Sequence, residues 1–388
     1  MGSSRKFSFA ALMLALCILG AACGSSSNGG STTPSSPAST SASAAGAAGL
    51  AAATALYNAG LKTTATFPGP SGKVHVGSEK IAVVSVGQAT VGASTTSMLV
   101  QEAIKAIGWT APPTYDGKFS PTVAAGYIEQ AVNAGDNGIV LVSITPSTVA
   151  SAVNLAGSKH IPIVCILCGP SPSSGVKATI INDEPSPVAT GELQAAYPIV
   201  NSGGKATVLV YADNQFAFTA LQIATAVKYL AAECSGCTVI EKQMQDTQQL
   251  VPGIPILSSV LTQHPKGTIG YLIAPYDSAA QLFVDLMHHL GRDEIKTIGY
   301  SATPNYAALV GAGNPPGAAA DITIPLPYMA WGAIDELART FAKQPTWNAS
   351  EMPVGLLTKA NYANYPASSQ FIAPPGNWEG KFRILWVH

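Results

Sequence analysis

Four of the six cysteines form two Cys-x-x-Cys pairs, a spacing that brings two thiols close enough to react or to bind a metal. Such pairs can serve redox catalysis, zinc binding or a short disulfide. Cys165 and Cys168 end an apolar run and are followed by Gly-Pro-Ser-Pro rather than a helix. Cys234 and Cys237 lie between a predicted helix and a predicted strand. A reactive pair usually begins a helix, so we predict two structural disulfides, which suit an oxidising compartment.

Other patterns that would indicate catalysis are missing from the sequence. We find no Gly-x-Ser-x-Gly, His-Glu-x-x-His or phosphate-binding loop, and no dinucleotide-type Gly-x-Gly-x-x-Gly that opens a helix. His288 and His289 suggest a metal, but neighbouring residues on a helix point about 100° apart and rarely share one ion. We therefore predict no enzyme activity, no cofactor and no metal site.

Residues 1–23 have the layout of a secretory signal peptide. A basic start precedes the apolar run 7–19 and a stretch of small residues, and the run is too short to span a bilayer. Cys23 follows directly and resembles the cysteine of a bacterial lipobox, although Gly20 stands where that motif usually has Leu. The resemblance implies a lipidated Cys23 at the mature N-terminus and an extracytoplasmic, membrane-anchored protein. Cleavage elsewhere would leave Cys23 unmodified.

Composition bounds the rest of the chain. Residues 24–75 begin with about thirty residues that are almost entirely Gly, Ser, Thr, Ala and Pro and carry no charge, and we predict a flexible tether. Roughly three hundred residues remain, enough for two domains. The net charge is −1 and 11% of residues are charged, so no basic face for nucleic acid is expected. Contact with the membrane is expected through the lipid only.

Strand and helix patterns alternate along this remainder. Short β-branched runs typical of buried parallel strands occur at 80–86, 138–143, 162–167, 178–181, 206–211, 238–242, 268–273 and 295–300. Helical patterns lie between them, among them 217–232, 254–262 and 278–290. Two successive runs of this kind predict an α/β protein with two doubly wound parallel-sheet domains joined by a hinge.

Several short stretches carry a resemblance to a known family. They are YIEQAV at 127–132, DNGIVL at 136–141, HIPIV at 160–164, APYDSAA at 274–280 and IGY at 298–300. Together they resemble the type I periplasmic-binding proteins, the solute receptors of ABC importers, over residues 80 to about 361. The resemblance implies one lobe of 76–183 plus about 326–356, and a second of 184–325 plus about 357–388. It also implies a monomer that closes on a small molecule and meets permease subunits.

In open parallel sheets, ligands bind beyond the carboxyl ends of the strands. The candidate ligand-binding residues are those that follow predicted strands: Gln88, Ser143, Thr145, Asp183, Asp213, Asn214, Gln215, Phe216, Tyr276, Asp277, Ser301 and Asn305. Structural alternatives stay open, because the aspartates could cap the helices that follow them. Phe216, Tyr276 and Trp331 could be core residues, and we expect one of these three rings to meet the ligand.

The chain also departs from the sugar-binding branch of that family. Ser301 and Pro325 stand where sugar-binding members commonly have Asp and Gln, and no Arg occurs between Asp213 and His264. Each desolvated hydroxyl left unpaired costs about 1–3 kcal/mol, so the loss weakens a sugar assignment. Two ligand classes stay open: a sugar-like molecule, or a neutral and partly apolar or aromatic one. A sensory receptor of the same fold that signals to a membrane partner is the alternative function.

Overall fold

The computed structural model describes residues 38–62, 66–170, 173–365, 372–374 and 376–388. The chain divides into two units, Met1–Ser39 and Thr40–His388, and all features below belong to the second. The signal peptide, Cys23 and the tether up to residue 37 lie outside the described residues. Within the described part of the chain, no helix combines the length and the apolar character needed to cross a bilayer.

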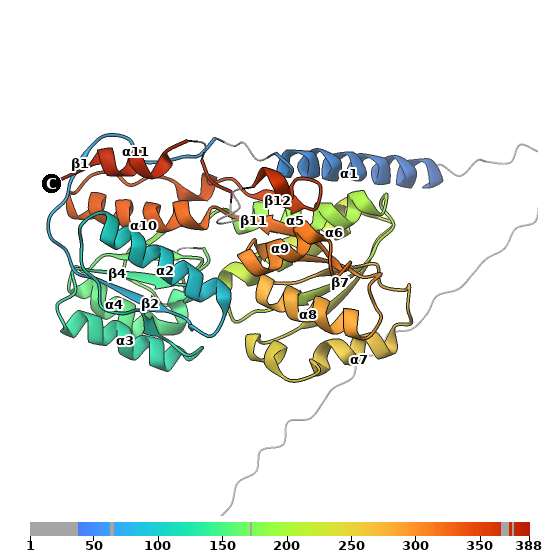
Figure 1. Cartoon of the computed structure of the whole chain (residues 1–388), viewed down its shortest axis with the longest axis horizontal. Coiled ribbons are helices and arrows are strands. Elements are labelled where there is room, and N and C mark those ends of the chain that lie inside the picture. Colours follow the sequence, from blue (N-terminus) through green and yellow to red (C-terminus); the bar gives the residue numbers. More distant parts are fainter. Residues whose placement is uncertain (1–37, 63–65, 171–172, 366–371, 375) are drawn as a thin grey trace, which may run out of the picture. The chain divides into compact units, whose positions relative to one another are not determined.

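The first lobe is built on a parallel sheet of order β3-β2-β4-β5-β6 (Figure 1). Its strands are β2 (Ile81–Ser85), β3 (Tyr115–Asp116), β4 (Gly138–Val142), β5 (Ile163–Ile166) and β6 (Ile180–Asn182). Successive strand residues face opposite sides, so two separate cores form. Helices α3 (Pro121–Asn133) and α4 (Ala150–Ser158) pack in one core, and α2 (Val91–Ala106) and α10 (Leu326–Phe341) in the other.

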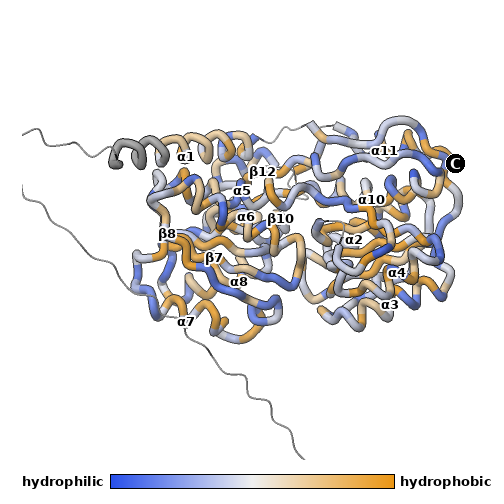
Figure 2. Tube along the Cα trace, turned by 180° about the vertical axis from the view of Figure 1, so that it is seen from behind, coloured by the Kyte–Doolittle hydropathy of each residue, from blue (hydrophilic) through white to orange (hydrophobic). Residues whose placement is uncertain are grey.

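The second lobe is built on a six-stranded sheet of order β12-β11-β10-β9-β7-β8. Only β12 runs antiparallel to its neighbour. The strands are β7 (Thr207–Ala212), β8 (Thr238–Gln243), β9 (Tyr271–Ile273), β10 (Lys296–Ser301), β11 (Ala318–Thr323) and β12 (Gly355–Thr358). The helices are α5 (Pro187–Asn201), α6 (Ala217–Glu233), α7 (Pro255–Gln263), α8 (Asp277–His289) and α9 (Pro304–Ala312). The strands read as hydrophobic in Figure 2, most clearly around β7.

These two sheets confirm the predicted α/β architecture with two parallel-sheet domains. The predicted strands and helices match the observed ones to within a few residues, because each is a β-branched run or an amphipathic segment that ends at a loop signal. Three short segments join the lobes: 183–186, 324–325 and 342–354. They exist because α10 packs against α2 and β5 of the first lobe, whereas β11 and β12 belong to the second sheet.

The prediction of a flexible tether over 24–75 is wrong for Ala38–Gly60, which forms helix α1. This segment is rich in alanine, a strong helix former, and it packs on the second lobe (Figure 1). Gly49 lies so close to the backbone of Glu233 that a Cβ there would sit 2.7 Å from the carbonyl carbon of Glu233. The ring of Tyr57 lies 6.1 Å from that of Tyr197. Packing therefore orders a segment whose composition alone predicts a flexible tether.

The assignment of 357–388 to the second lobe is wrong at its end. Helix α11 (Trp378–Leu385) and strand β13 (Trp386–Val387) lie on the first lobe, where β13 pairs in parallel with β1 (Val74–His75). The indole of Trp386 donates to Asp335 of α10 at 3.0 Å and stacks on Trp331 with centroids 5.2 Å apart. Trp331 is consequently a core residue of the first lobe and not a ligand platform.

Candidate functional site

A cavity lies between the carboxyl ends of the two sheets. Its volume is about 90 Å³. The first lobe and the segment that enters α10 contribute Val86, Thr90, Gly92, Ala93, Thr96, Phe119, Ser143, Leu167 and Leu326 to its wall. The second lobe contributes Phe216, Phe218, Thr219, Asp246, Tyr276, Asp277, Ser278, Tyr300, Ser301 and Thr303. Both lobes must therefore meet for the site to be complete.

Asp277 holds the loop after β10 in place. Its Oδ1 accepts from the backbone N–H of Tyr300 at 2.8 Å, and its Oδ2 accepts from the N–H of Thr303 at 2.5 Å and from the hydroxyl of Ser301 at 3.4 Å. The side chain is buried at the start of α8 and lines the cavity. Asp277 thus shapes the pocket wall, and most of its hydrogen-bonding capacity is used within the protein.

A second buried carboxyl, Asp321 of β11, lies behind Asp277. Burial raises the pKa of Asp277 to about 7, although a hydrogen bond with Asp321 opposes this rise, and burial together with the charge of Asp277 raises the pKa of Asp321 well above its usual range. Two adjacent carboxyls away from water share a proton rather than both ionise. The wall of the second lobe therefore holds an acidic pair that keeps one proton near neutral pH.

Another acidic group surrounds the phenol of Tyr276. This hydroxyl donates to Oδ2 of Asp213 at 3.0 Å, and Oδ1 of Asp213 accepts from the N–H of Gln215 at 2.9 Å. Asp246 stands on the other side, where its Oδ1 accepts from Gln249 at 2.6 Å. Burial raises the pKa of Asp213 to about 6 and also raises that of Asp246. Among the described residues, Oδ2 of Asp246 has no hydrogen-bond partner.

Aromatic rings form much of the remaining surface of the second lobe. Phe216 and Tyr276 meet edge to face with centroids 6.4 Å apart, and Phe218 stacks on Tyr300 at 5.6 Å. All four rings line the cavity, and Phe119 adds a ring from the first lobe. Two of the three rings considered from the sequence, Phe216 and Tyr276, are therefore at the site.

The wall of the first lobe is made of hydroxyl and apolar groups in tight loops. Phe119, Ser143 and Leu167 have φ angles of 54°, 56° and 57°, and Ser301 opposite them has 98°. Non-glycine residues rarely adopt this left-handed region, and such residues gather at functional sites. The loops at this end of the sheets are therefore held by the surrounding structure in conformations that their sequences do not favour.

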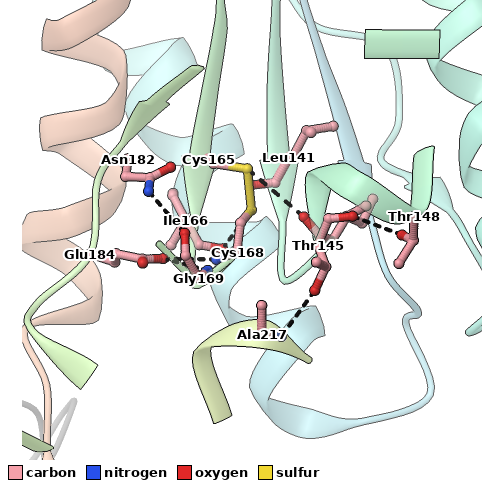
Figure 3. The surroundings of a disulfide bond; sticks show 11 residues. Leu141, Thr145, Thr148, Cys165, Ile166, Cys168, Gly169, Asn182, Glu184 and Ala217 are labelled. Carbon is pink, nitrogen blue, oxygen red and sulfur yellow. Dashed lines mark hydrogen bonds between the residues drawn. A yellow bond between two sulfur atoms is a disulfide. The ribbon is translucent and has the colours of Figure 1, made fainter. Parts of the chain in front are cut away.

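The two lobes touch directly beside the cavity (Figure 3). The backbone N–H of Ala217, at the start of α6, donates to the hydroxyl of Thr145 at 3.0 Å. Thr145 thus acts as a helix cap supplied by the other lobe, since Phe216 at the N-cap makes no side-chain cap bond. Gly169 also meets this helix, and a Cβ on it would lie 2.5 Å from that of Ala217.

The loop that carries Gly169 is closed by the disulfide between Cys165 and Cys168 (Figure 3). Backbone N–H groups of Cys168 and Gly169 donate to Oε2 of Glu184, at 2.8 and 3.2 Å. Burial raises the pKa of Glu184 to about 7, against the effect of these two bonds. The disulfide therefore braces a loop that links the cavity, the hinge and the opposing lobe. The other disulfide, Cys234–Cys237, joins the end of α6 to the start of β8 and is remote from the cavity.

Asp183 lies in the hinge and not at the cavity wall. It is completely buried and faces Glu336 and Asp335 of α10, so its pKa is raised well above the usual range by burial and by those charges. Neither of its carboxyl oxygens has a partner among the described residues. No three His, Cys, Asp or Glu side chains in the described part of the chain could hold a metal ion together.

The structure separates the predicted site residues into three groups. Ser143, Phe216, Tyr276, Asp277 and Ser301 line the cavity. Thr145, which caps α6, and Gln215, which accepts from the N–H of Asp246, line an adjoining cavity that shares Val86, Phe119, Ser143 and Phe216 with the first. The others lie elsewhere: Gln88 bonds to Ser97, Asp183 is in the hinge, Asp213 lies behind Tyr276, Asn214 bonds to Gln243, and Asn305 is exposed on α9.

Several lining residues were not found by sequence reasoning. Asp246 and Phe119 each follow a strand by three residues, after β8 and β3. The strand-end rule that indicated the other candidates also points to Asp246, which follows the predicted strand 238–242, whereas Phe119 follows the two-residue strand β3, which was not predicted. Thr90 and Thr96 lie at the start of α2, whose N-terminus opens on the cavity.

Comparison with known proteins agrees with this geometry. The family profile described as "Periplasmic binding protein domain" matches residues 81–340. No curated protein sequence matches the chain. An Agrobacterium vitis ABC transporter solute-binding protein with bound allitol is similar in structure, with a TM-score of 0.65 and 19% identity over 74% of this chain and 97% of that one. A Caulobacter myo-inositol binding protein, bound to myo-inositol, has a TM-score of 0.66 and 14% identity over 75% of this chain and 97% of that one. A Mycobacterium smegmatis solute-binding protein with bound glycerol has a TM-score of 0.65 and 17% identity over 76% of this chain and 100% of that one.

Proposed function

The chain belongs to the periplasmic binding protein family, and from this premise we propose that it captures a small solute between its lobes and delivers it to an ABC importer. The observation that carries the proposal is the cavity at the carboxyl ends of both sheets, with walls from both lobes. Three short connections between the lobes are suited to absorb a closing rotation. Binding energy then selects the closed form, because only that form brings both walls to the ligand.

We also propose that the protein works outside the cytoplasm, as a monomer tethered through a lipid on Cys23. The basic start, the apolar run and the cysteine at its end support this part of the proposal. A Cys23→Ala substitution is expected to release the protein from the envelope fraction while the folded part keeps its melting temperature. Retention of this variant in the membrane would contradict anchoring through Cys23.

A thermal-shift screen of the purified protein tests the receptor function. Monosaccharides, polyols and small organic compounds are added one at a time at saturating concentration. A tight ligand is expected to add about 3–4 kcal/mol to the free energy of unfolding at a thousandfold excess over Kd. Chemical conversion of the added compound, detected by mass spectrometry, would contradict a binding-only role. A screen in which no compound class raises the melting temperature would contradict the proposal itself.

The alternative, a receptor that reports its bound state to a membrane sensor, uses the same cavity. Reconstitution separates the two roles, because a transport receptor stimulates ATP hydrolysis by its importer when the ligand is present. Ligand binding without any such stimulation would favour the sensory role.

A further inference from the structure

The unused hydrogen-bonding groups of the cavity indicate what it holds. The phenol of Tyr276 has one proton and donates it to Asp213, so it cannot also satisfy Asp246. Asp246 is 4% exposed, lines the cavity and keeps Oδ2 without a partner among the described residues. A buried carboxylate oxygen without a donor is costly. The site therefore lacks a donor or a positive charge at this point, and a ligand can supply it.

The charges of the lining are all of one sign. Asp246 and Asp277 are its charged side chains, and among the described residues that line the cavity none is Lys, Arg or His, and none is Asn or Gln. Several hydroxyls are already used within the protein: Thr96 donates to Gly92, and Ser301 to Asp277. A polyol needs both donors and acceptors around each hydroxyl. The buried hydroxyl of Tyr300 also lines the cavity without a partner among the described residues and can donate to a ligand, but every charge on the described lining is negative.

The rings complete the pattern. Phe119, Phe216, Phe218, Tyr276 and Tyr300 line the cavity. The face of an aromatic ring attracts a cation that lies within about 6 Å of its centre, and the attraction is strongest where water is excluded. Methyl and methylene groups next to a charged nitrogen also bury well against such faces. Rings together with an unpaired carboxylate are the groups that a small ammonium compound requires.

We propose that the solute is a small organic cation, a primary to quaternary ammonium compound whose charge lies near Asp246 and whose apolar part faces the rings. This inference rests on the proposed function, because it names the ligand class of the same cavity. A cavity of about 90 Å³ suits a small molecule such as choline or ethanolamine.

Matched ligands test the inference by calorimetric titration. Choline is compared with 3,3-dimethyl-1-butanol, which has the same shape without the charge. Ethanolamine, glycerol and allitol serve as the primary-ammonium and polyol probes. We expect choline or ethanolamine to bind at least about tenfold more tightly than the neutral isostere, as the loss of a desolvated cation–π attraction requires.

Two variants locate the charge. Asp246→Asn keeps the shape and an acceptor for Gln249 but removes the negative charge, and it is expected to lower the affinity for the ammonium probe at least about tenfold. Asp293→Asn is the matched control, because Asp293 lies on the surface beside His288 and outside the cavity. Circular dichroism checks that both variants are folded. Unchanged affinity of Asp246→Asn for the neutral isostere would show that its pocket is intact.

The outcomes separate the inference from the receptor proposal. Calorimetric binding of the polyols without binding of the ammonium compounds would overturn the inference and leave the proposed receptor function intact. Equal binding of choline and its neutral isostere would also overturn it. Silence of every probe on the folded protein would contradict both. Selective binding of an ammonium probe that Asp246→Asn removes and Asp293→Asn preserves supports both.

Discussion

The two walls of the cavity differ in chemistry. The second lobe supplies both charged lining residues and four of the five rings, and more buried acid lies behind them at Asp213 and Asp321. The first lobe supplies hydroxyls, aliphatic groups and the single ring of Phe119. Its loops also make the contacts across the cleft, through Thr145 and Gly169. Under the proposed function, this difference assigns recognition of the ligand to the second lobe and closure over the ligand to the first.

The largest expected effect on stability and binding comes from a substitution in the wall that the second lobe contributes to the cavity. Each carboxylate oxygen of Asp277 accepts from a backbone N–H, and Asp277→Asn replaces one of these oxygens with an NH2 group that cannot accept, so at least one buried N–H loses its partner. We expect the free energy of unfolding to fall by about 3 kcal/mol and ligand binding to be lost. Urea denaturation measures the first and calorimetry the second. Unchanged stability would show that the loop 300–303 does not depend on Asp277.

A pH dependence of stability follows from the same wall and the hinge. The raised pKa values, about 6 for Asp213 and about 7 for Asp277, Glu184 and Glu336, mean that the folded protein binds protons more tightly than the unfolded chain. This stabilisation is complete below about pH 4 and is lost as the pH rises through about 7. We expect the free energy of unfolding of the ligand-free protein to fall by at least about 2 kcal/mol between pH 5 and pH 8, measured by urea denaturation. Stability that rises over this interval would show that these carboxyls are ionised and well paired.

Closure is tested from the first lobe by Gly169→Ala. The added Cβ would meet Ala217 of the second lobe, and φ is +90°. We expect about tenfold weaker ligand binding, because a smaller fraction of molecules reaches the closed form. Gly175→Ala is the control, since it carries a similar backbone strain at φ +76° but its Cβ meets only Ala150 within its own lobe. Equal losses in both variants would assign the effect to strain and not to closure.

The smallest effect is expected from Thr145→Val, which removes the cap that the first lobe gives to α6. Loss of such a cap costs about 1 kcal/mol, which corresponds to about fivefold weaker binding if the bond forms only in the closed form. Thr262→Val is the control, because the hydroxyl of Thr262 bonds only within its own helix. A loss of stability in the ligand-free protein without a change in affinity would show that the bond persists in the open form.

Sequence reasoning recovered the elements that local pattern determines and missed those that depend on distant partners. Strands such as β4 and β7 are continuous apolar runs and were predicted nearly to the residue. Helix α1 was missed because its small residues are ordered by packing on α5 and α6. The pairing of β13 with β1 joins residues more than three hundred positions apart and involves two residues in each strand. No local signal announces such a pair.

The site followed the same rule. Strand ends predicted Ser143, Tyr276 and Asp277 as candidates, and the structure places all three on the cavity, because topology alone brings these positions to one edge. Thr145 comes from the same edge, but its role as a cap depends on where the other lobe lies, and sequence carries no information on that distance. The sequence showed that arginine is scarce, and this absence alone suggested a neutral solute. The proposal of a positively charged solute depends instead on two acids that lie on the same wall as four of the five rings, which sequence spacing does not show.

The most direct test of the account measures the distance between the lobes with and without ligand. Spin labels at the exposed positions Glu129 of α3 and Gln263 of α7 report it by pulsed electron resonance. The account predicts a long and broad distance distribution in the free protein, and a shorter and narrower one when a solute that binds calorimetrically is added. The same distribution in both states, for a solute shown to bind, would contradict capture by closure of the two lobes.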